Sequence, residues 1–152
     1  MPVQKPGKSK QDYGTPRELL DAIEKRFGRI RWDLAATDAN AVTPNHITPE
    51  RDSLTVPWHK LKGLLFLNPP FANIDPWAQK CAAESAAGAR IVFLVPASVG
   101  SEWYRNHVER NAVVLALNPR ITFAGETTPY PKDCILAVFY AGLRGFDVWR
   151  WR

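Results

Sequence analysis

Runs of consecutive apolar residues dominate the hydrophobic pattern of the chain. Each run has the length of a strand that is buried on both faces of a sheet. The four clearest runs are residues 63–68 (GLLFLN), 89–96 (ARIVFLVP), 112–117 (AVVLAL) and 134–141 (CILAVFYA). Three weaker segments predict a short strand in 29–36 that ends near Asp33, an edge strand or bulge in 120–123 (RITF), and an edge strand in 146–151 (FDVWRW).

Residues 15–28 (TPRELLDAIEKRFG), just before the strand predicted in 29–36, have polar and apolar positions in helical spacing. Thr15 is the predicted N-cap, Pro16 fits the first turn, and Glu18 would complete a capping box. The apolar positions recur at intervals of three and four, which predicts one buried helix face. Gly28 can take the backbone conformation that ends a helix.

Two further helices are expected between the later strands. Asp75-Pro76 predicts a helix start with Asp75 as cap, and this helix should run to Gly88. Ser101 can cap a helix over residues 102–110, whereas residues 37–60 contain several prolines and should be irregular. Alternation of buried strands and helices predicts a largely parallel sheet with helices on both faces. Ligands of such sheets bind at the carboxyl ends of the strands.

The predicted strand at 63–68 ends in Asn68-Pro69-Pro70-Phe71, an unusual corner. Two consecutive prolines make the loop stiff and remove two backbone donors. The side-chain oxygen of Asn68 and the carbonyl of Pro69 are then two rigid acceptors, one residue apart. They could hold both hydrogens of an exocyclic amino group, while the ring of Phe71 offers a face for a planar base.

This corner predicts methyl transfer to an aromatic amine. The lone pair of such an amine is delocalised into its ring, and two acceptors that favour a tetrahedral nitrogen would restore its nucleophilicity. A sulfonium methyl donor leaves as a neutral group, so alignment and electrostatics would suffice. A base inside a duplex cannot reach the corner, so base flipping is implied. The alternative is that Asn68-Pro69-Pro70 forms an ordinary turn without a functional role.

Composition and charge add weaker constraints. The 152-residue chain has a formal net charge of +5 and a pI near 9.4, which is compatible with a polyanionic partner. No segment has the length and hydrophobicity of a membrane span, and residues 1–10 contain no apolar signal core, so we expect a cytoplasmic protein. The histidines have no metal-ligand spacing, and Cys81 and Cys134 are expected in the core. No metal site is therefore predicted.

An ordered set of short motifs resembles the phage-type DNA N6-adenine methyltransferases, which use S-adenosylmethionine and carry an NPPF- or DPPY-type corner. The motifs are DYGTP (12–16), WDLAATDAN (32–40), DSL (52–54), Trp58, NPPF (68–71), Trp77 with Lys80, IVFLVP (91–96) with Trp103, and RITF (120–123). The resemblance implies a Rossmann-like class I methyltransferase sandwich of three layers. Its sheet would be mostly parallel with an antiparallel C-terminal strand, and a phage or prophage origin would follow.

The resemblance also implies roles for individual residues. Thr15 and Pro16 would border the methionine end of the cofactor, and Tyr13 would also bind the cofactor. Asp33 would hold the cofactor's amino group or ribose, and Ala35 stands where most methyltransferases have a glycine-rich loop. The DSL motif places Asp52 and Leu54 toward the cofactor adenine. The amine-methylating corner would be Asn68, Pro69, Pro70 and Phe71, with Asn68 also near the cofactor, and Phe71 replaces the usual tyrosine.

Several of these positions have simpler interpretations. Thr15 and Pro16 also fit a plain helix start, Asp33 a capping carboxylate, and Asp52 a solvated loop acid. We interpret Trp77 and Trp103 as packing residues in preference to platforms on which a base stacks. An Arg120 contact with DNA phosphate and an internal ion pair are equally compatible with the sequence.

The expected organisation is a flexible basic tail (1–11) and one compact domain (12–152) without a separate target-recognition domain. Loops 37–60, 97–102 and 124–133 and the tail would then recognise double-stranded DNA, and either a monomer or a homodimer is open. Other functions remain as alternatives. They are methylation of cytosine N4, of an RNA base or of a protein glutamine, and a non-catalytic nucleic-acid-binding remnant.

Overall fold

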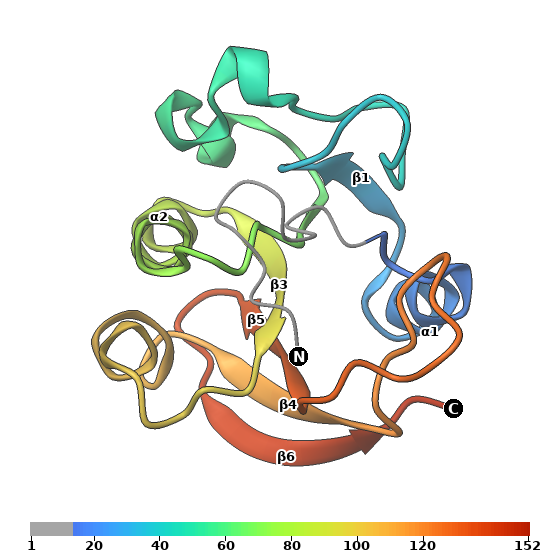
Figure 1. Cartoon of the computed structure of the whole chain (residues 1–152). Coiled ribbons are helices and arrows are strands. Elements are labelled where there is room, and N and C mark those ends of the chain that lie inside the picture. The colour runs from blue at the N-terminus through green and yellow to red at the C-terminus, as the bar shows by residue number, and fades with distance from the viewer. Residues whose placement is uncertain (1–13) are drawn as a thin grey trace.

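The computed structural model describes residues 14–152, so the predicted tail (1–11) and Tyr13 lie outside the described residues. Figure 1 shows one sheet with helices on both sides. The elements are α1 (Arg17–Phe27), β1 (Ile30–Asp33), η1 (Pro49–Arg51), η2 (Ser53–Thr55), η3 (Trp58–Lys60), β2 (Leu64–Leu67), α2 (Asp75–Ala86), β3 (Arg90–Pro96), η4 (Tyr104–Val108), β4 (Val113–Asn118), β5 (Cys134–Phe139) and β6 (Gly145–Arg150). Residues 37–60 contain three short 3-10 turns and no strand, which confirms the irregular segment.

The described strands form one six-stranded sheet in the order β1-β2-β3-β5-β4-β6. Strands β1, β2 and β3 pair in parallel, and so do β4 and β6. Strand β5 lies between β3 and β4 and is antiparallel to both. The expected mostly parallel sheet is confirmed, and β5 is the antiparallel strand near the C-terminus. Strand β6 lies at the edge, as its sequence predicts.

Each face of the sheet has its own apolar core. Helix α1 covers one face with Leu19, Leu20 and Ile23, whereas α2 and η4 cover the other (Figure 1). Strand β2 is buried at all four positions because both of its faces meet helices or loops. Burial of one such leucine side chain stabilises the fold by about 1.5–3 kcal/mol. The two cores therefore hold the carboxyl ends of β1 and β2 in fixed positions.

Both predicted N-caps of the long helices are corrected by the structure. Helix α1 has Pro16 at its N-cap position, without a side-chain cap bond. The hydroxyl of Thr15 instead accepts a hydrogen bond from Asn68, and Glu18 pairs with Arg152. Helix α2 has Ile74 at its N-cap, so Asp75 lies inside the first turn. Thr15 and Glu18 therefore bond to residues distant in sequence and do not form the predicted capping box at α1.

The predicted edge strand at 120–123 is wrong, because these residues form no strand. Ile121 and Phe123 are buried, which explains the apolar pattern. The backbone bonds here run to loops: Tyr130 donates to the carbonyl of Ile121, and Ala124, the residue after the segment, donates to the carbonyl of Gly14. The chain at 121–124 therefore holds loop residues, including Gly14 before α1, and does not extend the sheet.

The helix predicted over 102–110 is shorter than expected, and most of it is π-helical. Its regular part is the π-helical turn η4, Tyr104–Val108. The hydroxyl of Ser101 accepts a hydrogen bond from the backbone N–H of Tyr104 at 3.3 Å, which confirms its capping role. Val108 is fully buried, so this turn still covers the sheet.

Candidate functional site at the carboxyl ends of β1 and β2

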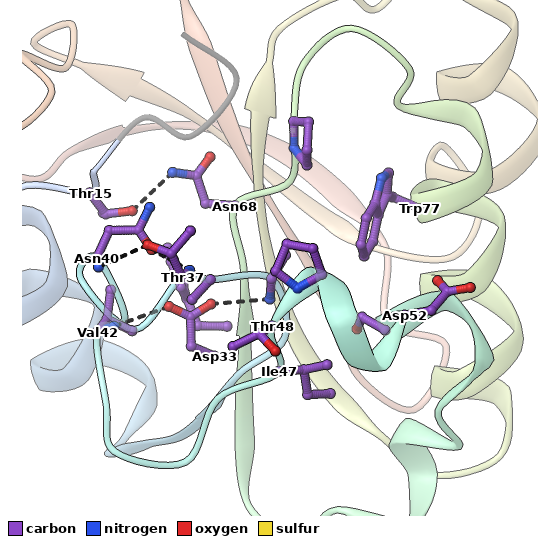
Figure 2. Close-up of a pocket in the computed structure, with 16 residues that line it drawn as sticks. Thr15, Asp33, Thr37, Asn40, Val42, Ile47, Thr48, Asp52, Asn68 and Trp77 are labelled. Atoms are coloured by element: carbon purple, nitrogen blue, oxygen red, sulfur yellow. Dashed lines mark hydrogen bonds between the residues drawn. The ribbon is translucent and has the colours of Figure 1, made fainter. Parts of the chain in front are cut away.

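A cavity of about 290 Å³ lies where β1 and β2 end side by side. This volume is near the lower limit of ordinary ligand pockets, which begin at about 300 Å³. Figure 2 shows side chains from the β1 end, the 37–53 segment, the corner after β2 and α2 around it. The lining residues are Thr15, Asp33, Ala35, Ala36, Thr37, Asn40, Val42, Ile47, Thr48, Pro49, Asp52, Ser53, Phe66, Asn68, Pro70 and Trp77.

The structure brings together six of the residues that the sequence analysis selected. Pairing of β1 with β2 brings Asp33 close to Asn68, and a hydrogen bond between Thr15 and Asn68 adds the residue before α1. The six are Thr15, Asp33, Ala35, Asp52, Asn68 and Pro70. Four other selected residues, Pro16, Leu54, Pro69 and Phe71, do not line it.

Asp33 is the last residue of β1 and is only 3% exposed. Its carboxylate accepts hydrogen bonds from the backbone N–H of Val42 at 3.1 Å and of Ala35 at 3.3 Å. Burial raises the pKa of this carboxyl from its ordinary value to about 6, although both N–H groups and nearby His46 favour the ionised form. Such a carboxylate is stabilised by a bound cation.

The backbone of Asp33 fixes the loop that surrounds its side chain. Its N–H donates to the carbonyl of Asn45, and its carbonyl accepts from the N–H of Ile47. The 42–47 segment therefore passes along the end of β1. Asp33 is therefore a capping carboxylate for loop N–H groups, and it also lines the cavity, as a ligand-binding residue would.

A polar pair that the sequence analysis did not select also lines the cavity. The N–H of Thr37 donates to Oδ1 of Asn40 at 2.7 Å, and the N–H of Asn40 donates to the hydroxyl of Thr37 at 3.3 Å. Short polar side chains three positions apart commonly form such reciprocal turns. The T-x-x-N spacing was a usable signal, and it lies inside the WDLAATDAN motif.

Asn68 is positioned by a residue 53 positions earlier. Its Nδ2 donates to the hydroxyl oxygen of Thr15 at 3.1 Å (Figure 2). This bond fixes the rotation of the amide, because the nitrogen faces Thr15. Thr15 is held in turn through its neighbour Gly14, whose carbonyl accepts from Ala124 at 2.9 Å. A Cβ at Gly14 would lie 3.1 Å from the Cβ of Ala124, so this close approach favours glycine.

The ring of Phe71 belongs to an aromatic cluster beside the cavity. Its centroid lies 6.2 Å from that of Phe123 and 5.9 Å from that of Tyr130, both edge to face. Phe123 and Tyr130 also meet edge to face at 5.5 Å. The cluster ties the 124–133 segment to the corner, so the shape of the corner depends on both.

The structure gives the contacts of Arg120 and Trp77, whose roles the sequence did not decide. Arg120 forms an ion pair with Asp133 at 2.8 Å, which is the internal alternative. Trp77 packs against the core, as expected, and it also lines the cavity.

No group of three or more His, Cys, Asp or Glu side chains within residues 14–152 could hold a metal ion. No helix in the same range is long and apolar enough to cross a membrane.

Comparisons with known proteins point to one family. The sequence profile of the DNA N-6-adenine-methyltransferase (Dam) family matches residues 3–138. The chain is 27% identical over 133 residues to the DNA N-6-adenine-methyltransferase of Escherichia phage T1, covering 88% of this chain and 55% of the phage protein. It is 31% identical over 132 residues to the enzyme of that name from Haemophilus phage HP1, covering 83% and 74%. The chain thus spans about half and three quarters of these relatives, and it belongs to the DNA N-6-adenine-methyltransferase family.

Proposed function

We propose that this protein transfers a methyl group from S-adenosylmethionine to the N6 amino group of adenine in DNA. The observation that carries the proposal is the shared cavity of Asp33, Thr15 and Asn68 at the ends of two parallel strands. Family membership supports the reaction, because both phage relatives bear the name of this activity. The geometry supports it independently, since it joins a buried carboxylate to a rigid amide.

The cavity fits a sulfonium cofactor with an amino acid end. The Asp33 carboxylate would hold a positively charged group, and Thr37 and Asn40 would contact the polar amino acid end. Ala35 and Ala36 lack side chains beyond Cβ, so they permit close approach where glycines are common in methyltransferases. The bound cofactor would supply an activated methyl group on sulfur and would leave as a neutral thioether.

The corner after β2 would hold the amino group. The carbonyl oxygens of the Asn68 side chain and the Pro69 backbone would accept its two hydrogens. Thr15 acts as a positioning residue, because its hydroxyl accepts from the Asn68 nitrogen and so orients the amide oxygen. The nitrogen would form a bond to the methyl carbon as the carbon–sulfur bond breaks. The amine then loses one proton to water, and no separate base is required.

A flipped base of double-stranded DNA is the proposed substrate. Unpairing exposes the amino group that an intact duplex hides. The 97–102 loop and the 124–133 segment would contact the DNA, since they lie after β3 and beside the corner. The formal charge of +5 favours a polyanion.

The test is mass spectrometry of nucleosides from unmethylated DNA incubated with S-adenosylmethionine and the protein. The proposal predicts N6-methyladenine with the wild type and its loss with Asn68→Ala. N4-methylcytosine would change the base, and methylation of RNA or protein alone would overturn DNA as substrate. No cofactor binding would support the non-catalytic remnant.

A further inference from the structure

A second cavity, of about 180 Å³, lies at the end of the sheet opposite to the candidate site. Leu64 and Arg90, the first residues of β2 and β3, pair side by side and line it. Tyr140 also lines it, because β5 is antiparallel to β3 and ends at this edge. The other walls are mostly aliphatic and aromatic side chains. The cavity is smaller than ordinary ligand pockets of about 300 Å³ or more, so it suits a single planar ring system.

The turn after β5 holds two exposed apolar side chains at this cavity. The N–H of Leu143 donates to the carbonyl of Tyr140 at 3.0 Å. Ala141 and Gly142, between them, have φ of 51° and 71°, as the two central residues of a type I′ turn do. Tyr140 is 44% exposed and Leu143 is 54% exposed, and both line the cavity. Large apolar groups that stay exposed beside a cavity mark an interaction site.

Two arginines flank the cavity, and aromatic rings hold each guanidinium group. The guanidinium carbon of Arg90 lies 4.9 Å from the ring centroid of Tyr140. That of Arg26 lies 5.4 Å from the Phe27 centroid and 5.0 Å from the Trp149 centroid. Both arginines are exposed, and neither forms an ion pair with a carboxylate of residues 14–152. A stacked guanidinium group keeps N–H donors at its edge, and these donors match the oxygens of a phosphate.

Basic residues gather at the same end of the molecule. The starts of β1, β2, β3 and β4 and the turn between β5 and β6 carry Lys25, Arg26, Arg29, Lys62, Arg90, Arg110 and Arg144. The nearest acids along the chain are Glu24, which pairs with Arg17, and Glu109. The segments at the other ends of β1, β2 and β3 (33–40, 68–75 and 97–102) contain Asp33, Asp38, Asp75 and Glu102 and no Lys or Arg. The end with the second cavity therefore attracts a polyanion.

We propose that the second cavity, with Arg26 and Arg90, is a binding site for single-stranded nucleic acid. An unpaired base would enter the cavity beside Tyr140 and Leu143. The phosphates next to this base would accept hydrogen bonds from the two guanidinium groups. Proteins that bind single strands combine these features, with aromatic surfaces for the bases and cations for the backbone. Bases of an intact duplex stay paired inside the helix, so the apolar cavity favours a single strand.

Charge argues against a second copy of this chain as the occupant. A two-fold contact would place the same patch of both copies face to face. Arg26, Arg90 and Arg144 would then lie opposite the like charges of the other copy, which is unfavourable. A nucleic-acid backbone would neutralise these charges instead.

The test is fluorescence anisotropy of a labelled oligothymidylate, about 12 nucleotides long, with the full chain. Thymine has no exocyclic amino group, so it is not a substrate for the corner at Asn68. Tyr140→Ala should weaken binding by about 5- to 150-fold, the range for loss of one stacking contact. Arg26→Gln and Arg90→Gln should each lower the slope of log affinity against log salt by about 0.7.

The matched control for these charge changes is Arg105→Gln. Arg105 is exposed, lies on η4 and does not line the second cavity. This variant should bind the probe like wild type and with the same salt slope. Thermal melts check that each variant is folded. Equal binding by wild type and Tyr140→Ala, or no binding by the wild type, would overturn the proposal.

Three further measurements identify the occupant. Tyr140→Ala should change the affinity for a duplex of the same length little, and an equal loss for duplex and single strand would overturn the assignment of an unpaired base. An oligouridylate probe separates RNA from DNA, and loss of affinity in Tyr140→Ala with either strand supports the proposal. Sedimentation velocity of the protein alone should show no dimer that depends on Tyr140. A dimer that Tyr140→Ala dissociates would assign the patch to self-association and overturn the proposal.

Discussion

The two polar centres of the cavity are built in different ways. Asp33 ends a regular strand, and its carboxylate is held by backbone N–H groups of its own loop. Asn68 follows a strand as well, but its amide is held by Thr15, far away in sequence. The Asp33 side can be assembled locally, whereas the Asn68 side requires the chain before α1 to be in place. We call the Asp33 side the charged wall and the Asn68 side the oriented wall. Under the proposed function, the charged wall would bind the cofactor and the oriented wall would hold the reacting amine.

The largest effect is expected when the oriented wall is broken. Asn68→Ala removes an acceptor for the amino group and should lower kcat by about 100-fold or more, as loss of a preorganised polar contact does in other enzymes. The cofactor dissociation constant should change little. Single-turnover methylation of a short duplex measures this rate. A kcat near wild type would contradict the role of the corner.

The charged wall should make stability depend on pH. Because burial raises the folded-state pKa of Asp33 to about 6, protonated Asp33 favours the folded state. This contribution is complete below the unfolded-state pKa of 3.8 and is lost as pH rises through about 6. It amounts to about 3 kcal/mol. Denaturation of wild type and Asp33→Asn from pH 4 to 7.5 measures it.

In that comparison, the free energy of unfolding of the wild type should fall relative to Asp33→Asn as pH rises. A difference that stays constant with pH would show that Asp33 does not titrate in this range.

The affinity for the cofactor should increase as pH rises, whereas the stability of the free protein should decrease. A cationic ligand stabilises the ionised Asp33 carboxylate, so binding of S-adenosylmethionine should strengthen as pH rises from 5 to 7 through the pKa of about 6. Asp33→Asn should bind about 10- to 150-fold more weakly at pH 7.5, the range for a hydrogen bond to a charged group. Its affinity should vary less with pH. Calorimetry at several pH values distinguishes these profiles.

The smallest effect concerns the link between Thr15 and Asn68. Thr15→Val removes the hydroxyl with little change in shape and should lower kcat by about 2- to 12-fold, the value of a neutral hydrogen bond. Thr15→Ser keeps the hydroxyl and is the matched control. Steady-state kinetics with both variants tests the link. Equal loss in both variants would indicate that the methyl group of Thr15 matters, and not its hydroxyl.

The sheet was predictable because buried strands leave continuous apolar runs. Strand β2 is buried at every position and reads as LLFL, so its position followed directly. The segment at 120–123 was misassigned because Ile121 and Phe123 are buried from a loop. Periodicity reports burial, and it does not distinguish a strand from a buried loop of four residues.

The candidate site was predictable where strand ends carry polar residues. Asp33 ends β1 and Asn68 follows β2, and the parallel pairing of these strands brings the two residues together. The Thr15 bond was not predictable, because a helix start explained the same residue locally. Trp77 was interpreted as packing alone, since an aromatic residue on a helix gives the same pattern on a core face and on a cavity wall.

The most direct test is titration of S-adenosylmethionine into Asn68→Ala and Asp33→Asn side by side at pH 7.5. The account predicts that Asn68→Ala binds like wild type and that Asp33→Asn binds at least about 10-fold more weakly. Equal loss of binding in both folded variants, or retention in Asp33→Asn with loss in Asn68→Ala, would contradict the assignment of the two walls.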